Sequence, residues 1–149
     1  MILRWLVTTI HLLALPLGLG AIVARSRGLR RVNNSADLAR VFVADSLWGL
    51  AAALWIATGL WRAFGGLEKG TEYYINNRAF YVKMGLLGII LLLEIAPMTT
   101  LIGWRIAVRR GEAINLAPAS AFARLSQVQA ALVVLMVFAA TAMARGFFY

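Results

Sequence analysis

Four long apolar segments set the first constraint on this chain of 149 residues. They cover roughly residues 3–23, 41–61, 79–103 and 122–144, and each is long enough to cross a hydrocarbon core of about 30 Å as a helix. Backbone polar groups in lipid must be bonded within their own segment, and none of the four segments shows the period-two alternation of barrel strands. The sequence therefore predicts an all-α integral membrane four-helix bundle, formed by residues 1–149 as a single transmembrane domain.

The composition agrees with a membrane protein and excludes several kinds of cofactor. Hydrophobic residues make up 62% of the chain and charged residues only 14%, which is far from the usage of an average soluble domain. The chain has no cysteine, so it forms no disulfide and ligates neither an iron–sulfur cluster nor a haem through a thiolate. We find no Walker, HExxH or GxGxxG motif, so common nucleotide and metalloprotease chemistries lack support.

Arginine placement predicts the orientation in the membrane. The loops expected at 24–40 and 104–121, with their flanks, carry more Arg than the opposite side, where both termini and the loop 62–78 lie. By the positive-inside rule the Arg-rich loops face the cytoplasm and both termini face outward, into the periplasm of a bacterial inner (plasma) membrane. The net charge of +9 sits at the ends of the spans. We therefore expect anionic membrane lipids, and no nucleic acid, as its partners.

Two opposite charges lie inside the third apolar segment. A charge at bilayer depth costs about 2.5–3.5 kcal/mol and usually marks a pathway, a ligand contact or a buried partner. Lys83 and Glu94 share one helix face but are about 16 Å apart along the axis, too far to pair directly. Lys83 either extends to the head groups or faces the bundle interior. Glu94 has a functional role or a structural polar bond, with Gln127 or Gln129 of the fourth segment and residues of the second segment as candidate partners. Both are candidate catalytic residues.

His11 is the single histidine and lies about 12 Å into the first segment. A neutral imidazole there is suited to ligating haem iron or relaying a proton, and the structural alternative is a hydrogen bond across helices. A second axial ligand would have to come from Met84, Lys83, water or another copy of the chain. Trp48 follows the side of Asp45 on the second segment, where an indole serves packing or the stacking of a porphyrin.

The segment from Arg62 to Arg78, RAFGGLEKGTEYYINNR, is the most polar connection in the chain. Its glycines favour turns, and its tyrosines suit a membrane interface. We expect a hairpin cap between the second and third helices, or a short lid over a site in the same half of the bundle.

Several words of the sequence carry a resemblance to known proteins. The resemblance is spread over about 130 positions and is carried by stretches such as HLLALPLGLGAIVAR, NNRAFYVKMGLL and E.APMTTLI.WR. In these stretches the chain resembles a family of small bacterial predicted membrane proteins without an assigned function. More distantly, a four-helix bundle with an early His and Lys resembles the HemJ-type protoporphyrinogen IX oxidases. That family is associated with haem b, and its motif His and Lys fall on His11 and Lys83. It also has a second helical histidine, which this chain lacks, so the resemblance implies haem or porphyrin binding rather than protoporphyrinogen oxidation.

Three hypotheses follow for function. The first is a haem- or porphyrin-linked redox or binding protein, a haem-dependent oxidoreductase in its enzymatic form. In it His11 ligates haem b iron, Trp48 contacts the cofactor, Lys83 faces a carboxylate, and quinone exchanges electrons. The second is a small proton-coupled permease in which Glu94 and Asp45 titrate. The third is an accessory subunit of a larger membrane complex, or a homo-oligomer, in which the buried polar residues fix an interface.

Overall fold

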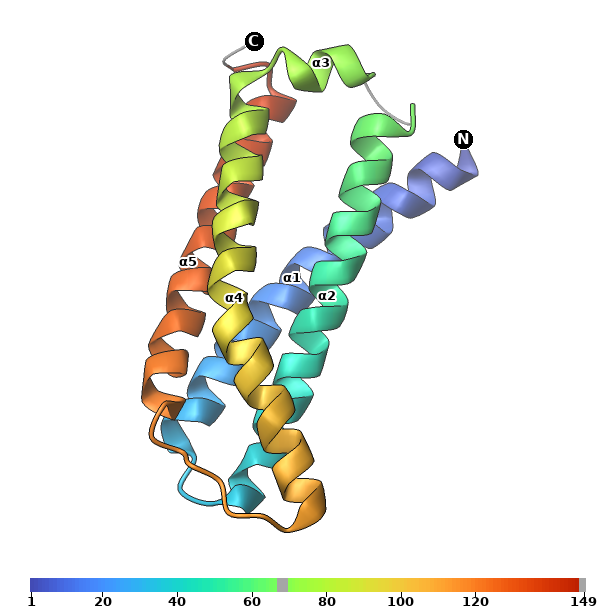
Figure 1. Cartoon of the computed structure of the whole chain (residues 1–149). Coiled ribbons are helices and arrows are strands. Elements are labelled where there is room, and N and C mark those ends of the chain that lie inside the picture. Colours follow the sequence, from blue (N-terminus) through green and yellow to red (C-terminus); the bar gives the residue numbers. More distant parts are fainter. Residues whose placement is uncertain (67–69, 148–149) are drawn as a thin grey trace.

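The computed structural model describes residues 1–66 and 70–147 and consists of helices throughout the regular part of that range. Four long helices run along the molecule: α1 (Ile2–Arg31), α2 (Leu38–Phe64), α4 (Arg78–Arg110) and α5 (Ala119–Ala144). Two short ones, the 3₁₀ helix η1 (Ser35–Asp37) and α3 (Thr71–Ile75), lie in the connections. The expected all-α bundle of four long apolar helices is confirmed (Figure 1).

Each long helix extends beyond the apolar segment that predicted it. α1 continues to Arg31, so the expected loop 24–40 is wrong for its first eight residues, and the actual turn is short. That turn is fixed by a capping box, in which the Asn34 side chain accepts from the backbone N–H of Asp37 and the Asp37 carboxylate accepts from that of Asn34. α4 likewise continues to Arg110 and is capped by Gly111, whose φ of +66° favours glycine.

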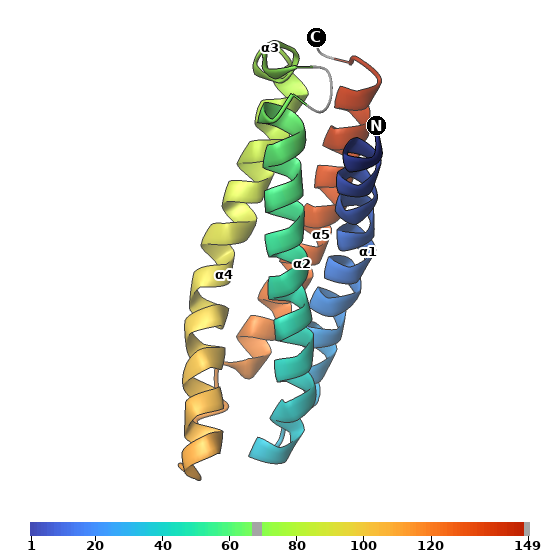
Figure 2. The same ribbon diagram turned by 90° about the vertical axis from the view of Figure 1, so that its right-hand side faces the viewer.

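The helices pack in the order α2, α1, α5, α4, and the backbones of α2 and α4 approach each other far less than those of the neighbouring pairs. Figure 1 shows α1 crossing behind the space between α2 and α4, and Figure 2 shows α2 between α4 and α1. Close approach of α1 to α2 depends on Gly18, where an added Cβ would lie 3.3 Å from the Ala51 side chain. Both termini and α3 lie at one end, called the upper end below as drawn in Figure 1.

Two apolar clusters form the core, one above the other. The lower cluster includes Leu29, Val41 and Leu101, and the middle cluster includes Ile22 and Val133. Many large apolar side chains point outward instead, among them Leu92 (69% exposed) and Phe138 (68%). Outward apolar side chains along all four helices are what a lipid-embedded bundle presents, and the molecule is a multi-pass membrane protein with four candidate spans.

Candidate functional site

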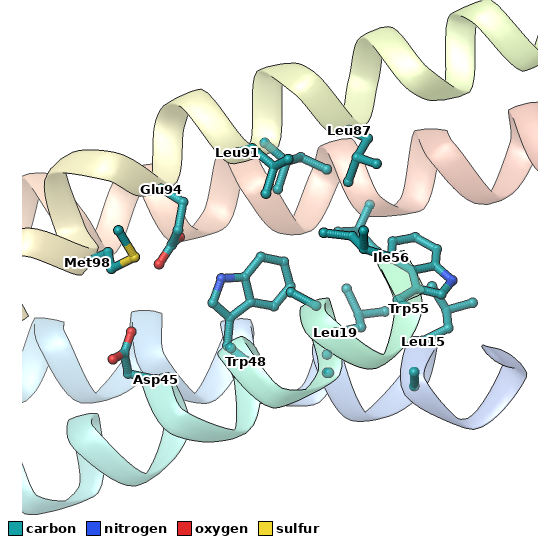
Figure 3. Close-up of a pocket in the computed structure, with 17 residues that line it drawn as sticks. Leu15, Leu19, Asp45, Trp48, Trp55, Ile56, Leu87, Leu91, Glu94 and Met98 are labelled. Atoms are coloured by element: carbon teal, nitrogen blue, oxygen red, sulfur yellow. The ribbon is translucent and has the colours of Figure 1, made fainter. Parts of the chain in front are cut away.

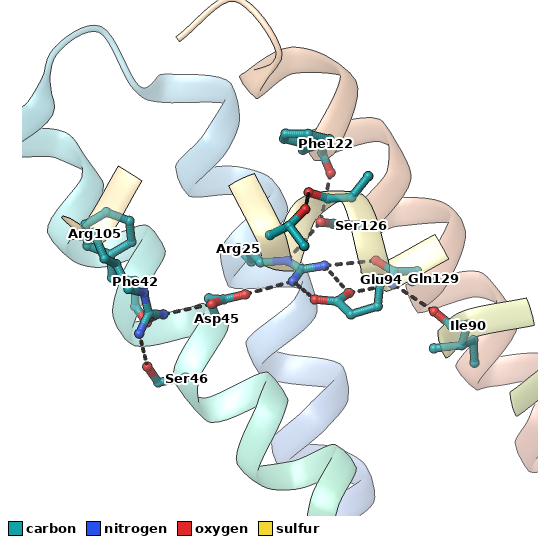
Figure 4. A network of polar contacts seen from close by, with 12 residues as sticks. Arg25, Phe42, Asp45, Ser46, Ile90, Glu94, Arg105, Phe122, Ser126 and Gln129 are labelled. Carbon is teal, nitrogen blue, oxygen red and sulfur yellow. Dashed lines mark hydrogen bonds and ion pairs between the residues drawn. The ribbon is translucent and has the colours of Figure 1, made fainter. Parts of the chain in front are cut away.

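A buried arginine sits between the two apolar clusters. The side chain of Arg25 on α1 has no exposed surface, and its guanidinium has five N–H donors. The structure provides five acceptor contacts, so no donor is left over (Figure 4). The acceptors are Asp45 Oδ1 (2.9 Å) on α2, Glu94 Oε1 (2.6 Å) and Oε2 (2.9 Å) on α4, and Ser126 Oγ (3.1 Å) and Gln129 Oε1 (2.9 Å) on α5. One side chain therefore joins all four long helices.

The partners of Arg25 are satisfied in turn. Gln129 Nε2 donates to Glu94 Oε2 at 2.7 Å and to the carbonyl of Ile90 at 3.3 Å. Among the described residues every hydrogen bond to Glu94 comes from a donor, which is the pattern of an ionised carboxylate. Of the two glutamines predicted as partners of Glu94, Gln129 makes the hydrogen bond. The network (Arg25, Asp45, Glu94, Ser126, Gln129 and Arg105) pairs two guanidinium groups with two carboxylates, and Arg105 Nε is its one buried donor without a partner among the described residues.

Arg105 extends the network toward the lower end. Its guanidinium donates to Asp45 Oδ2 at 2.7 Å, to the Phe42 carbonyl at 2.9 Å and to Ser46 Oγ at 3.1 Å, and it stacks 5.1 Å from the Phe42 ring centroid. These contacts join α4 to α2 at the lower end. At the upper end the rings of Phe64 and Phe80 meet edge to face. The space between α2 and α4 is therefore bridged at both ends.

Sequence reasoning did not single out Arg25, because it assigned the residue to a basic loop. The available signal was its spacing from the apolar face of the first helix. His11, Gly18, Ile22 and Arg25 fall at the i, i+7, i+11 and i+14 positions that face a partner helix, and all of them are buried. Glu94, in another span, needs a partner of opposite charge, and together with this spacing that need indicates Arg25.

A lower chamber of ≈ 260 Å³ lies directly above the network, between α1, α2 and α4. Its walls are apolar apart from the carboxylate end, where Asp45 and Glu94 stand. Figure 3 shows the Trp48 indole lying across the chamber, with its ring nitrogen toward that end. The predicted site residues Trp48 and Glu94 therefore share this chamber.

An upper chamber of ≈ 340 Å³ lies at the end that holds both termini. His11 from α1, Arg62 from α2 and Lys83 and Met84 from α4 line it, together with aromatic side chains of α3. Lys83 thus faces the bundle interior, the second of the two orientations that the sequence left open. The predicted His11 and Lys83 share this chamber, and neither Trp48 nor Glu94 lines it. Leu15, Trp55, Ile56 and Leu87 form the wall common to both chambers.

The orientation of His11 is fixed from α2. Its Nδ1 lies 2.9 Å from Thr58 Oγ1, and the Thr58 hydroxyl donates its single proton to the Leu54 carbonyl at 2.6 Å. Thr58 must therefore accept from His11, so Nδ1 carries the proton and Nε2 keeps its lone pair. Gly59 makes room for the ring, because an added Cβ would lie 3.2 Å from His11 Cε1.

The connection predicted as a cap or lid folds over the upper chamber. Its residues 67–69 lie outside the described residues, and α3 occupies its second half. Tyr73 donates from its hydroxyl to the Met143 carbonyl on α5 at 2.6 Å, and Tyr74 is buried. Both line the chamber, so α3 forms part of its upper wall. The described residues contain no group of three or more His, Asp or Glu side chains arranged for a metal ion.

Comparison with known proteins places the chain in a family. No curated protein and no solved structure matches it. A family model described as "Predicted membrane protein (DUF2214)" matches residues 3–147, which is nearly the whole chain. The four candidate spans agree with that description. The chain therefore belongs to the DUF2214 family of predicted membrane proteins.

Proposed function

We propose that this protein binds haem b or a related porphyrin in its upper chamber and serves a redox or tetrapyrrole-binding role in the bacterial inner membrane. The observation that carries the proposal is the meeting of His11 and Lys83, from α1 and α4, in one largely apolar chamber. A chamber of ≈ 340 Å³ lies within the range of about 300–1,000 Å³ that is usual for small-molecule sites.

The hydrogen bonding of the His11 ring supports ligation of a metal centre. A histidine ligand needs a free lone pair on one ring nitrogen and a hydrogen bond on the other that holds the ring in place. Thr58 supplies that bond at Nδ1, and Gly59 leaves space for the ring. His11 would therefore hold the iron through Nε2, with Met84 as a second candidate ligand from the same chamber wall.

The two cations of the chamber support a ligand that carries carboxylates. Arg62 and Lys83 stand on opposite helices, α2 and α4, among apolar and aromatic side chains. Porphyrins combine a flat apolar ring with carboxylates at one edge, and Arg and Lys bind carboxylates through charge-assisted hydrogen bonds. Lys83 and Arg62 would thus orient the acid edge. Haem bound there would supply a one-electron iron couple.

The proton-coupled permease hypothesis receives less support from the contacts. It needs Glu94 and Asp45 to exchange protons, yet both carboxylates are ion-paired with the same buried guanidinium. Protonation of either would leave a donor of Arg25 without its charged acceptor. We assign these two residues to the stability of the bundle, and the expected catalytic role of Glu94 stays an untested prediction.

A reduced-minus-oxidised visible spectrum tests the proposal. The full chain is produced with ample haem supply, purified in mild detergent, and compared with His11→Ala. Ser26→Ala is the matched control, because Ser26 is also a buried polar residue of α1, donates to the Ala123 carbonyl at 2.8 Å, and lines neither chamber.

We expect a haem b spectrum in the wild type and in Ser26→Ala, and its loss in His11→Ala. A well-folded wild-type protein that stays colourless and binds no added haem would refute the proposal. A haem spectrum that survives His11→Ala would refute the assigned ligand.

A further inference from the structure

The lower chamber opens sideways, toward the lipid. Two of its α4 side chains, Leu91 and Met98, are 44% and 45% exposed, so they form a rim at the molecular surface. Gly49 and Ala52 form the facing rim on α2, where their small size leaves the space open. The exposed rim residues on α2 and α4 indicate that the chamber opens between these two helices at the molecular surface, the side that faces the bilayer in a membrane-embedded bundle.

Inside the chamber one hydrogen-bond donor is left without a partner. The Trp48 side chain is 7% exposed, and within residues 1–66 and 70–147 its Nε1–H has no hydrogen bond. Figure 3 shows this nitrogen turned into the chamber, toward the end where Glu94 and Asp45 lie. The indole N–H opens onto the chamber and is free to donate, so a ligand that presents a carbonyl oxygen there would gain a hydrogen bond.

The surrounding charges restrict the ligand to a neutral molecule. All five donors of Arg25 are already bonded, so the network offers no cation to an acidic head group. The two carboxylates at the chamber end would repel an anion. Two indoles, those of Trp48 and Trp55, line the walls and suit a flat ring.

We infer that the lower chamber binds a lipophilic quinone, which enters from the bilayer between α2 and α4 and accepts a hydrogen bond from Trp48 Nε1. Its ring lies between apolar walls and its chain extends through the lateral opening. The quinone site does not depend on the assignment of a tetrapyrrole to the upper chamber. Of the residues that define the quinone site, only Trp55 lines both chambers.

Quenching of indole fluorescence by decylubiquinone tests the inference on the full chain in lipid nanodiscs, prepared without haem. Trp5 and Trp61 are 65% and 50% exposed, so both are changed to Phe to remove signals from lipid-facing indoles. In that background Gly49→Leu places a side chain in the opening. Gly103→Leu is the matched control, because it lies on an exposed face of α4 that lines neither chamber, and an added Cβ meets nothing within 4 Å at either glycine.

We expect saturable quenching in the parent and in Gly103→Leu, and a half-saturation concentration raised about tenfold or more in Gly49→Leu. Trp48→Phe, followed through the quenching of the remaining Trp55 and Trp104, of which only Trp55 lines the chamber, should bind about three- to tenfold more weakly, because one hydrogen bond is lost. Equal half-saturation in Gly49→Leu and Gly103→Leu would overturn the site. Equal competition by decylbenzene, which has no carbonyl, would overturn the quinone and leave a groove for an acyl chain.

Discussion

At the scale of single residues, Arg25 shows how a charge is accommodated in the middle of an apolar bundle. Its five donors meet five acceptors on three other helices, and apolar clusters lie above and below it. Breaking a buried ion pair by removing one partner usually costs about 3–5 kcal/mol, because the remaining charge is left uncompensated. The stability of the bundle should therefore depend on this side chain.

We expect Arg25→Ala to lower the free energy of unfolding by about 3–5 kcal/mol, measured by SDS-induced unfolding in mixed micelles and followed by circular dichroism. Arg25→Lys should recover only part of that loss, since an ammonium has three donors for five acceptors. Arg27→Ala, on the exposed side of the same helix, is the control and should change stability little. An Arg25→Ala variant as stable as the control would contradict the assigned role.

Lys83 allows a test of ligand chemistry in the upper chamber. Removing a charge-assisted hydrogen bond to a carboxylate should weaken binding about tenfold. We expect Lys83→Met to reduce the affinity for protoporphyrin IX by this factor and to leave the affinity for its dimethyl ester unchanged, with both measured by absorbance titration. An equal loss for the acid and the ester would mean that Lys83 acts through packing and does not recognise a carboxylate.

Some of these buried polar residues could be predicted from the sequence as site residues, and others could not. Lys83, Glu94 and His11 stood out because a polar residue inside an apolar segment is costly. Arg25 stood just beyond the apolar run, where basic residues ordinarily mark the end of a span. The hydrogen-bond partners of these residues could not be predicted, because the packing of the helices, and not the sequence of any one segment, decides which helices are neighbours.

At the scale of elements, the pair α2 and α4 behaves differently from the other neighbouring helices. Their backbones approach each other far less than those of the neighbouring pairs, and side-chain bridges join them at the two ends. Both chambers lie in the region between those bridges. The Arg105 bridge therefore sets the spacing of the two helices beside the lower chamber.

Loss of that bridge should be visible as a change in helix spacing. Because the chain has no cysteine, spin labels can be attached at the exposed positions Val43 on α2 and Ile106 on α4. We expect Arg105→Met to lengthen the label-to-label distance by about 1–2 Å or to broaden its distribution, measured by pulsed electron paramagnetic resonance. Arg109→Met, on an exposed position of the same helix, should give the wild-type distribution. Identical distributions in both variants would mean that the bridge does not hold the helices.

Apolar length predicted the number and order of the long helices, because crossing lipid demands that length whatever the partners are. It did not predict their ends. α1 and α4 continue into stretches rich in arginine, where the helix is maintained by backbone hydrogen bonds, and in α4 also by the C-cap at Gly111, rather than by hydropathy. The short helix α3 was missed for a similar reason, since a polar segment of this length has no apolar period to indicate it.

At the scale of the whole molecule, the orientation in the membrane is a prediction from charge. Both termini and α3 lie at one end (Figure 1), and most of the arginines lie at the other. The positive-inside rule then places the upper chamber near the outer face. If this prediction holds, a ligand of the upper chamber binds near the outer face of the membrane.

Single cysteines report this orientation directly. We expect a membrane-impermeant maleimide to label Thr71→Cys, at the start of α3, in intact cells. Ala113→Cys, an exposed residue of the connection between α4 and α5, should be labelled only after the cells are permeabilised. The reverse pattern would show that the termini face the cytoplasm.

The central claim is that His11 and Lys83 form part of a tetrapyrrole site in the upper chamber. Titration of the haem-free chain with haem, followed in the Soret region, measures it most directly. We predict a saturable band that reaches its plateau at one haem per chain in the wild type and is absent in His11→Ala. A non-saturating absorbance rise that is the same in both proteins would mean that haem only partitions into the detergent, and it would contradict the claim.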